Sequence, residues 1–266
     1  MRARFIFDLV SKGAELPYHH QYLITEFLTP YIQHYLKSSK EPSGIYYNFS
    51  ALKGQTAIGK EGLRFYSNKV SLVFSSNDEA LVASVIHQLF NEKEVTLGKL
   101  VLHPICVDQE IPVTFATEMK YICLSPIALI RPEENPIDAR RFIHPSYDTF
   151  SDALYESTMN RMERAGATAE ELGQYFQFQL IPDKEYLNRI KDSEKKFARN
   201  YPVFIHNEKN EVRGYTFPFT FYAHPKVQEF IFHCGFGVFT EMGFGMLDIA
   251  NTDLHLRTIP YPIQKN

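Results

Sequence analysis

The sequence is poor in cysteine, and its acidic and basic residues nearly balance. The three cysteines, Cys106, Cys123 and Cys234, lie far apart in apolar runs, which predicts reduced thiols rather than disulfides or a zinc site. The formal net charge is −3 and the pI is about 6.4. This balance excludes a protein that binds polyanions over its whole surface, so any contact with nucleic acid must come from a local basic region.

Long apolar runs are also missing. No stretch approaches the roughly 18 consecutive apolar residues that a membrane-spanning helix needs. Asp8 interrupts the apolar N-terminal segment, and no small-residue cleavage site follows it. The sequence therefore predicts a soluble, cytoplasmic protein with no membrane contact. What the chain does have is 266 residues, of which 44% are hydrophobic, enough to build a substantial core without disulfides.

The first part of the chain has the pattern of two helices set among four strands. Strands are predicted from alternating or β-rich residues, and helices from apolar residues at helical spacing. Pro30 follows Thr29, a good N-cap, and predicts that the first helix is two abutting pieces. The predicted elements are a strand at 2–10, a helix from Ile24, strands at 45–52 and 63–74, a helix at 79–90 and a strand at 95–107. This βαββαβ order is that of a ferredoxin-like domain.

A second copy of the same order is readable in the rest of the chain. The predicted elements are a strand at 119–130, a helix at 150–165, strands around 174–181 and 212–223, a helix at 225–234 and a last strand at 242–250. A loop at 131–145 and a charged helix or arm at 183–200 interrupt them. The predicted fold is α+β, with two tandem ferredoxin-like domains at residues 1–115 and 116–266.

The strongest local signal is a pair of Gly-Phe-Gly triplets separated by five residues. Its glycines are Gly235, Gly237, Gly243 and Gly245. Glycine allows positive φ and close backbone approach, and consecutive exposed amides can bind phosphate. The alternative interpretation is a tight connection whose glycines accommodate a bulge and close strand packing. The spacing fits neither a nucleoside-triphosphate loop nor a dinucleotide fingerprint.

The segment CGFGVFTEMGFGMLDI resembles the C-terminal glycine-rich loop of the sixth Cas family, the CRISPR-associated endoribonucleases of the RAMP superfamily. The segments LPYHHQYLI, YYNFSAL and YICLSPIAL agree with it. The resemblance implies tandem ferredoxin-like domains and metal-independent cleavage of precursor CRISPR RNA. In that reaction the 2′-hydroxyl attacks the adjacent phosphate and leaves 2′,3′-cyclic phosphate and 5′-hydroxyl ends. It implies CRISPR repeat RNA as partner and no cofactor, with CRISPR effector subunits and a second copy of the chain as further candidate partners.

Such a reaction needs a base, an acid and a group that offsets charge at phosphorus. In the resembled family the histidine lies between the end of the first helix and the next strand, an interval that only His34 occupies here. His34 is therefore the predicted catalytic residue, with Tyr31 as its helper and Lys37, one turn on, as phosphate partner. His20, beside His19 at the start of the helix, is the alternative histidine. No metal site is predicted, because the other histidines are dispersed.

Binding of RNA is predicted for the four glycines and for Arg140 and Arg141, an unmixed basic pair in the loop at 131–145. Relatives often carry a lysine between the triplets, whereas this chain has Glu241 there. Weaker candidates are Arg161 and Arg164, spaced for one helix face, and the charged arm at 183–200. Tyr46 and Tyr147 are candidates for stacking on bases.

Two other functions stay open at the level of sequence. One is a catalytically inactive RNA-binding subunit of a CRISPR complex. The other is an enzyme or ligand-binding α+β protein for small molecules, without an RNA role, which the acidic pI favours.

Overall fold

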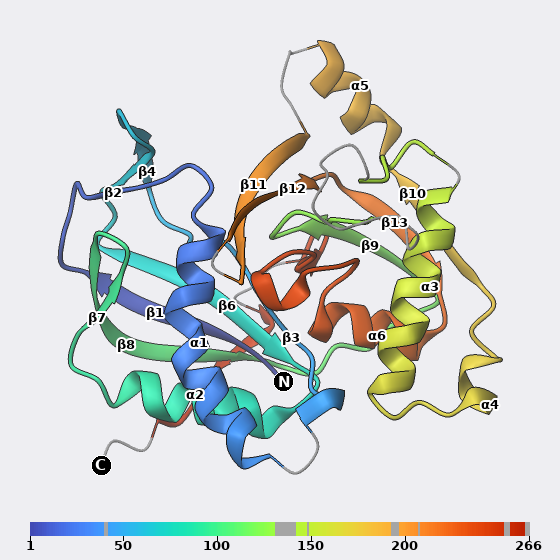
Figure 1. Cartoon of the computed structure of the whole chain (residues 1–266), viewed down its shortest axis with the longest axis horizontal. Helices are drawn as coiled ribbons and strands as arrows, with labels where there is room; N and C mark the ends of the chain where they lie inside the picture. The colour runs from blue at the N-terminus through green and yellow to red at the C-terminus, as the bar shows by residue number, and fades with distance from the viewer. Residues whose placement is uncertain are drawn as a thin grey trace.

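The computed structural model has two main sheets side by side, each covered by helices (Figure 1). It describes residues 1–39, 42–130, 142–147, 149–192, 197–206, 208–252 and 256–263. Two large apolar cores, one for each sheet, contain most of the buried side chains. None of the helices in these ranges is long and apolar enough to cross a membrane.

The first sheet and its helices form the first module. In chain order its main elements are β1 (Arg2–Leu9), α1 (Gln21–Ser38), β3 (Tyr47–Phe49), β6 (Lys69–Ser76), α2 (Glu79–Phe90) and β8 (Leu100–Glu110). The strands lie in the order β8-β1-β6-β3, so the first strand of the unit is central, as in a ferredoxin-like domain. The smaller additions are β2 (Glu15–Leu16), η1 (Pro42–Gly44), β4 (Thr56–Ile58), β5 (Leu63–Phe65) and β7 (Val95–Leu97).

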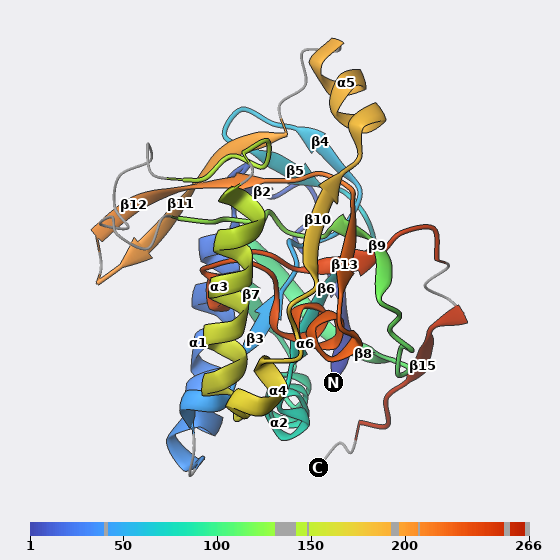
Figure 2. The same ribbon diagram turned by 90° about the vertical axis from the view of Figure 1, so that its right-hand side faces the viewer.

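The second module repeats this order. Its main elements are β9 (Glu118–Cys123), α3 (Thr149–Arg164), β10 (Phe178–Pro182), β13 (Phe219–Ala223), α6 (Pro225–Cys234) and β14 (Leu247–Ile249), and its strands lie in the order β10-β13-β9-β14. The additions are α4 (Ala169–Leu172), α5 (Lys184–Asp192), β11 (Ala198–Ile205), β12 (Glu208–Tyr215) and η3 (Thr240–Met242). Both views show α5 projecting away from the two sheets (Figures 1 and 2). The predicted tandem ferredoxin-like fold is confirmed.

Local sequence explains most of these elements. Asp78 caps α2 by accepting hydrogen bonds from the Ala80 and Leu81 amides, as an N-cap aspartate does. The prediction that the first helix is broken near Thr29 is wrong, because α1 runs on with Pro30 inside it. Ile24, Leu28 and Ile32 are buried along one face of α1, and this packing outweighs the backbone hydrogen bond that proline removes.

The last strand of the chain returns to the first module. β15 (Thr258–Pro260) pairs antiparallel with β8, with Thr258 opposite Glu110. Tyr261 and Ile263 pack against the first core. The division near residue 115 stays a prediction, but the assignment of all residues after it to the second module does not hold for this segment.

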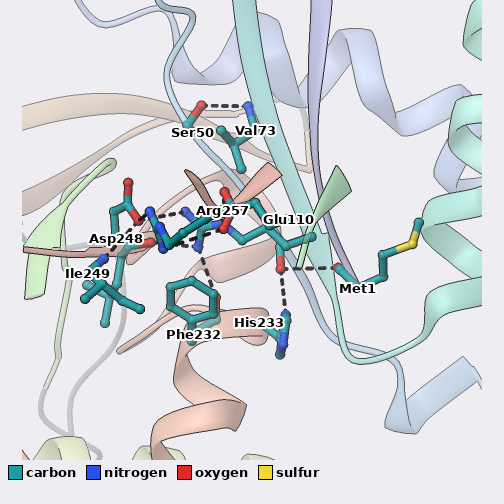
Figure 3. Close-up of polar contacts among 12 residues, drawn as sticks. Met1, Ser50, Val73, Glu110, Phe232, His233, Asp248, Ile249 and Arg257 are labelled. Carbon is teal, nitrogen blue, oxygen red and sulfur yellow. Dashed lines mark hydrogen bonds and ion pairs between the residues drawn. The ribbon is translucent and has the colours of Figure 1, made fainter. Parts of the chain in front are cut away.

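A buried ionic cluster lies where the two modules meet (Figure 3). The Arg2 Nε donates to Glu110 Oε1 at 3.0 Å, and its Nη1 donates to the Leu247 carbonyl at 2.7 Å. Arg257 Nη2 donates to Asp248 Oδ1, also at 2.7 Å. Arg2, Glu110 and Asp248 are almost fully buried. The cluster therefore links β1 and β8 of the first module to β14 of the second module and to the returning segment.

Candidate functional site

The three predicted catalytic residues lie on α1, each three residues from the next, but they differ in exposure and contacts. His34 and Lys37 are exposed and are three residues apart, so they are neighbours on the helix surface. Tyr31 instead points towards α2 and β7, where its hydroxyl donates a hydrogen bond to Glu92 Oε1 at 3.0 Å. The structure thus leaves His34 and Lys37 exposed on α1, whereas the Tyr31 hydroxyl is engaged with Glu92.

The surroundings of Tyr31 disagree with a role in holding phosphate. Burial raises the pKa of its hydroxyl, and the hydrogen bond to Glu92 raises that pKa further. Tyr31 lines a pocket of about 370 Å³ together with Glu26, Glu92 and Glu94. Three carboxylates in one pocket would repel the negative charge of a phosphate. Tyr31 is better explained as a link between α1 and the end of α2.

The alternative histidine, His20, is a packed residue at the start of α1. It is 5% exposed, and its Nδ1 lies 3.1 Å from the Pro17 carbonyl oxygen. Its ring meets the Phe65 ring edge to face, and burial lowers its pKa. A strand of RNA would have no access to this ring in the present fold.

The glycine-rich loop, residues 235–245, is buried at all four glycines. The amides of Gly235, Gly243 and Gly245 donate to the carbonyls of Ile231, Thr240 and Pro126 at 2.7–3.0 Å. The prediction that these amides are exposed to phosphate is therefore corrected. The structure agrees with the alternative interpretation, in which the glycines allow close packing of the backbone.

The loop forms a second contact between the two modules, besides the buried ionic cluster. From the first module, the Gln21 amide of α1 donates to the Gly243 carbonyl at 2.6 Å. The Asn48 amide of β3 donates to the Phe244 carbonyl at 2.7 Å. Both amide side chains are buried, so these two bonds form without competition from water and fix the loop against α1 and β3.

Arg161 of α3 holds the loop from the other side. Its Nη1 donates to the Gly235 carbonyl at 2.9 Å, and its Nη2 donates to the Cys234 carbonyl at 2.6 Å and to Thr240 Oγ1 at 3.2 Å. The guanidinium also lies 4.9 Å from the centre of the Tyr46 ring. Arg161 is a candidate RNA contact by its helical spacing, but in the structure its guanidinium donates hydrogen bonds to the loop.

Comparison with known proteins identifies this arrangement. A sequence model described as "CRISPR associated protein Cas6, C-terminal" matches residues 109–249, more than half of the chain and the whole of the glycine-rich loop. The chain belongs to the Cas6 family of CRISPR-associated proteins. No curated protein matches it in a separate sequence search.

Solved Cas6 and RAMP structures share the fold. A Cas6-related protein from Pyrococcus furiosus matches with a TM-score of 0.75 at 17% identity, over 95% of this chain and 99% of that one. A RAMP protein described as binding different RNA substrates matches with a TM-score of 0.73 at 18% identity, over 94% of this chain and 100% of that one. A third structure, described as CRISPR associated protein Cas6, has a TM-score of 0.70 at 18% identity, with 94% and 99% covered.

Two predicted RNA contacts of this Cas6-family chain, Arg140 and Arg141, lie outside the described residues.

The hairpin β11–β12 is not among the predicted elements, although the apolar run YPVFI before a polar turn is a strand signal. The hairpin lies against α1 and the glycine-rich loop. The Tyr201 ring centre is 4.5 Å from His19 and 5.6 Å from Phe244, and Phe204 is 5.2 Å from Tyr22.

These five aromatic side chains, His19, Tyr22, Tyr201, Phe204 and Phe244, form an aromatic seam between the modules. Phe204 is 44% exposed, and the guanidinium of Arg199 is close enough to lower the pKa of His19, which partial burial already lowers. Phe244 is fully buried, and His19, Tyr22 and Tyr201 are half-buried. Of the seam, Phe204 is therefore the side chain exposed enough to be a candidate for stacking on an unpaired base.

Gly245→Ala is expected to lower the free energy of unfolding by about 2–4 kcal/mol. Gly245 has φ of +75°, and a Cβ there would overlap the Phe236 carbonyl oxygen. Gly166→Ala is the control, because Gly166 has φ of +100° but nothing lies within 4 Å of the added methyl. Urea unfolding measures both variants. Equal losses for the two would contradict the packing role of Gly245.

Proposed function

We propose that this chain binds the repeat of a precursor CRISPR RNA in the cytoplasm and cleaves it in a metal-independent reaction. The family match over residues 109–249 is the observation that carries the proposal. The tandem ferredoxin-like fold and the exposed pair of His34 and Lys37 support it. Membership of the Cas6 family supports RNA as the substrate. His34 and Lys37 on α1 are the residues that carry out the proposed cleavage.

In the proposed reaction His34 accepts the proton of the ribose 2′-hydroxyl. The 2′-oxygen then bonds to the adjacent phosphorus, and the bond from phosphorus to the 5′-oxygen of the next nucleotide breaks. The leaving 5′-oxygen takes a proton from water, so the products carry a 2′,3′-cyclic phosphate and a 5′-hydroxyl. Histidine as a residue type exchanges protons near neutral pH. The Lys37 ammonium offsets the negative charge that develops on the phosphate oxygens.

His34→Ala is expected to slow cleavage of the host's CRISPR repeat RNA by about 10²–10⁴-fold, the usual contribution of a positioned acid or base. Binding should change little, because the variant keeps every lysine and arginine. Single-turnover cleavage in EDTA measures the rate, and end analysis of the products detects the cyclic phosphate. His87→Ala is the matched control, since His87 is an exposed histidine on α2. Equal rates for His34→Ala and the unchanged protein would refute this assignment.

A second function, binding of repeat RNA without cleavage, is favoured by two observations. Tyr31 is bound to Glu92, and His34 lies thirteen residues along α1 from Gln21, the contact to the glycine-rich loop. That is about 20 Å along the helix axis. Retention of repeat RNA by the unchanged protein, with no cleaved product after long incubation, would support this second function over the first.

A further inference from the structure

Strand β4 forms an open edge of the first module. It is the outer strand of the small sheet β2-β5-β4, and no described strand pairs with its outer side. Figure 1 shows this sheet at the outer margin of the first module. All three residues of β4 are exposed, and the Ile58 side chain is 83% exposed. Another strand can pair along such an edge.

The register of β4 decides which of its backbone groups face outward. The Gln55 carbonyl accepts a hydrogen bond from the Tyr66 amide at 3.0 Å, and the Gly59 amide donates across the turn to β5 at 2.8 Å. In an antiparallel pair, residues that bond to the neighbouring strand alternate with residues that do not. The N–H and C=O groups of Thr56 and Ile58 therefore point away from β5, to the open side.

This edge lacks the usual protection against pairing. Natural edge strands commonly carry proline, charges or a covering segment. Residues 54–59 read GQTAIG and contain neither proline nor charge. Other outer strands of the chain are protected, since β10 ends at Pro182, β15 ends at Pro260 and β12 carries several charged residues. The backbone of β4 is thus free to pair.

An apolar row leads from the first core to the same edge. Leu16 pairs with Leu63, and Leu63 pairs with Ile58, so the three side chains lie on one face of the sheet. Leu16 is buried, and Leu63 packs against the first core. Ile58 is the exposed outer end of this row. A further strand beside β4 would extend the row and remove Ile58 from water.

We propose that β4 pairs antiparallel with β4 of a second copy of this chain, about a twofold axis through Ala57. In this register Thr56 lies opposite Ile58 of the second copy, and the outward backbone groups of both residues form the ladder bonds. The two Ile58 side chains become diagonal neighbours on one face, a spacing that large side chains still bridge. The inference goes beyond the proposed function and needs no RNA.

The second copy is the occupant that the strand itself fits. About this axis Ala57 faces its own small side chain, Gln55 faces Gly59, and Lys60 faces Gly54, so no like charges stand opposite each other. The contact is small, because β4 has three residues. We therefore expect a weak, reversible dimer with a dissociation constant of roughly 10–500 µM, as for small transient interfaces.

Sedimentation equilibrium from about 1 µM to 1 mM measures the dimer. Ile58→Lys should raise the dissociation constant at least about tenfold, because each dimer then holds two ammonium groups on one face of the ladder. Phe176→Lys is the matched control, since Phe176 is 84% exposed and lies in the second module before β10. Both positions are exposed, so neither change should unfold the monomer. A monomer at every concentration, or equal dimerisation of the two variants, would overturn the proposal.

Cysteine cross-linking tests the register. Across the axis the two Ala57 residues form a non-hydrogen-bonded pair with Cα atoms about 4.5 Å apart, within the range of a disulfide. Oxidised glutathione should therefore link Ala57→Cys into a covalent dimer more completely than Ile58→Cys, whose diagonal partner is about 7–8 Å away. The unchanged protein, with its three cysteines, gives the background. Equal or greater linking of Ile58→Cys would overturn the proposed pairing.

Both assays contain protein alone, which separates this proposal from the proposed function. Loss of the dimer in Ile58→Lys with cleavage of repeat RNA unchanged would support the pairing and leave the cleavage proposal intact. A dimer that forms as expected in a protein that cuts no repeat RNA would also support the pairing, while the cleavage proposal would fail.

Discussion

Glu110→Ala is expected to lower the free energy of unfolding by about 3–5 kcal/mol, the usual result of removing one partner of a buried ion pair. Glu110 accepts the hydrogen bond from Arg2 Nε, and both side chains are almost completely buried. Without the carboxylate, Arg2 keeps its charge in the interior and has Asp248 at 4.0 Å as its nearest acidic group. Because Glu110 Oε2 also lies 4.0 Å from Arg257 Nη1, the returning segment should loosen when the carboxylate is removed.

Urea unfolding measures this loss, and Glu61→Ala provides the comparison. Glu61 pairs with Lys99 at 3.2 Å, but its side chain is 76% exposed. A surface pair of this kind contributes at most about 1 kcal/mol. A loss at Glu110 no larger than at Glu61 would show that the buried cluster does not hold the modules together. Hydrogen exchange of the β15 amides gives a second readout, and faster exchange in Glu110→Ala is expected.

Arg161→Ala should destabilise the protein by about 3–5 kcal/mol and loosen the glycine-rich loop. The variant removes donors to three backbone carbonyls, those of Cys234, Gly235 and Gly237, and to Thr240 Oγ1. Hydrogen bonds from a charged donor contribute about 1.5–3 kcal/mol each, and buried carbonyls left without a partner add a desolvation cost. The effects are not additive, so the total stays below their sum.

Arg164→Ala is the matched control, because Arg164 is exposed near the end of the same helix. It should change stability by less than about 0.5 kcal/mol. Arg161→Lys keeps the charge but not the planar donor geometry and should fall between the two. Hydrogen exchange at the Phe236 and Gly245 amides reports on the loop itself. Unchanged exchange in Arg161→Ala would contradict a role of Arg161 in positioning the loop.

Much of the fold is predictable because its signals are local. The apolar spacing of α2 and its Asp78 cap lie within one short segment, as does the alternation of β1. The predicted βαββαβ order agrees with the observed strand order in both modules. The predictions that failed involve competition between local signals and packing. Pro30 is an example, since it stays within a helix whose opposite face is buried.

The candidate site was predictable only as a set of residue types. The paired glycine triplets pointed to the right family, yet they did not show that the loop amides are used inside the protein. Tyr31 has helical spacing with His34, but its hydroxyl is directed by Glu92, 61 residues away in the sequence. Nothing near either residue in the sequence reveals that pairing.

The sequence by itself determined the helices, most strands, the repeated order and the family, because hydrophobic periodicity, capping residues and glycine spacing act over a few neighbouring positions. The tertiary structure alone decided which charges are enclosed in ion pairs and which line an open groove. Arg2 and Arg4 alternate on the same strand and face, yet Arg2 is enclosed with Glu110 while Arg4 lines an open groove. The difference arises because the second module and the returning segment cover Arg2 and leave Arg4 uncovered. These covering contacts form only when residues hundreds of positions apart are brought together.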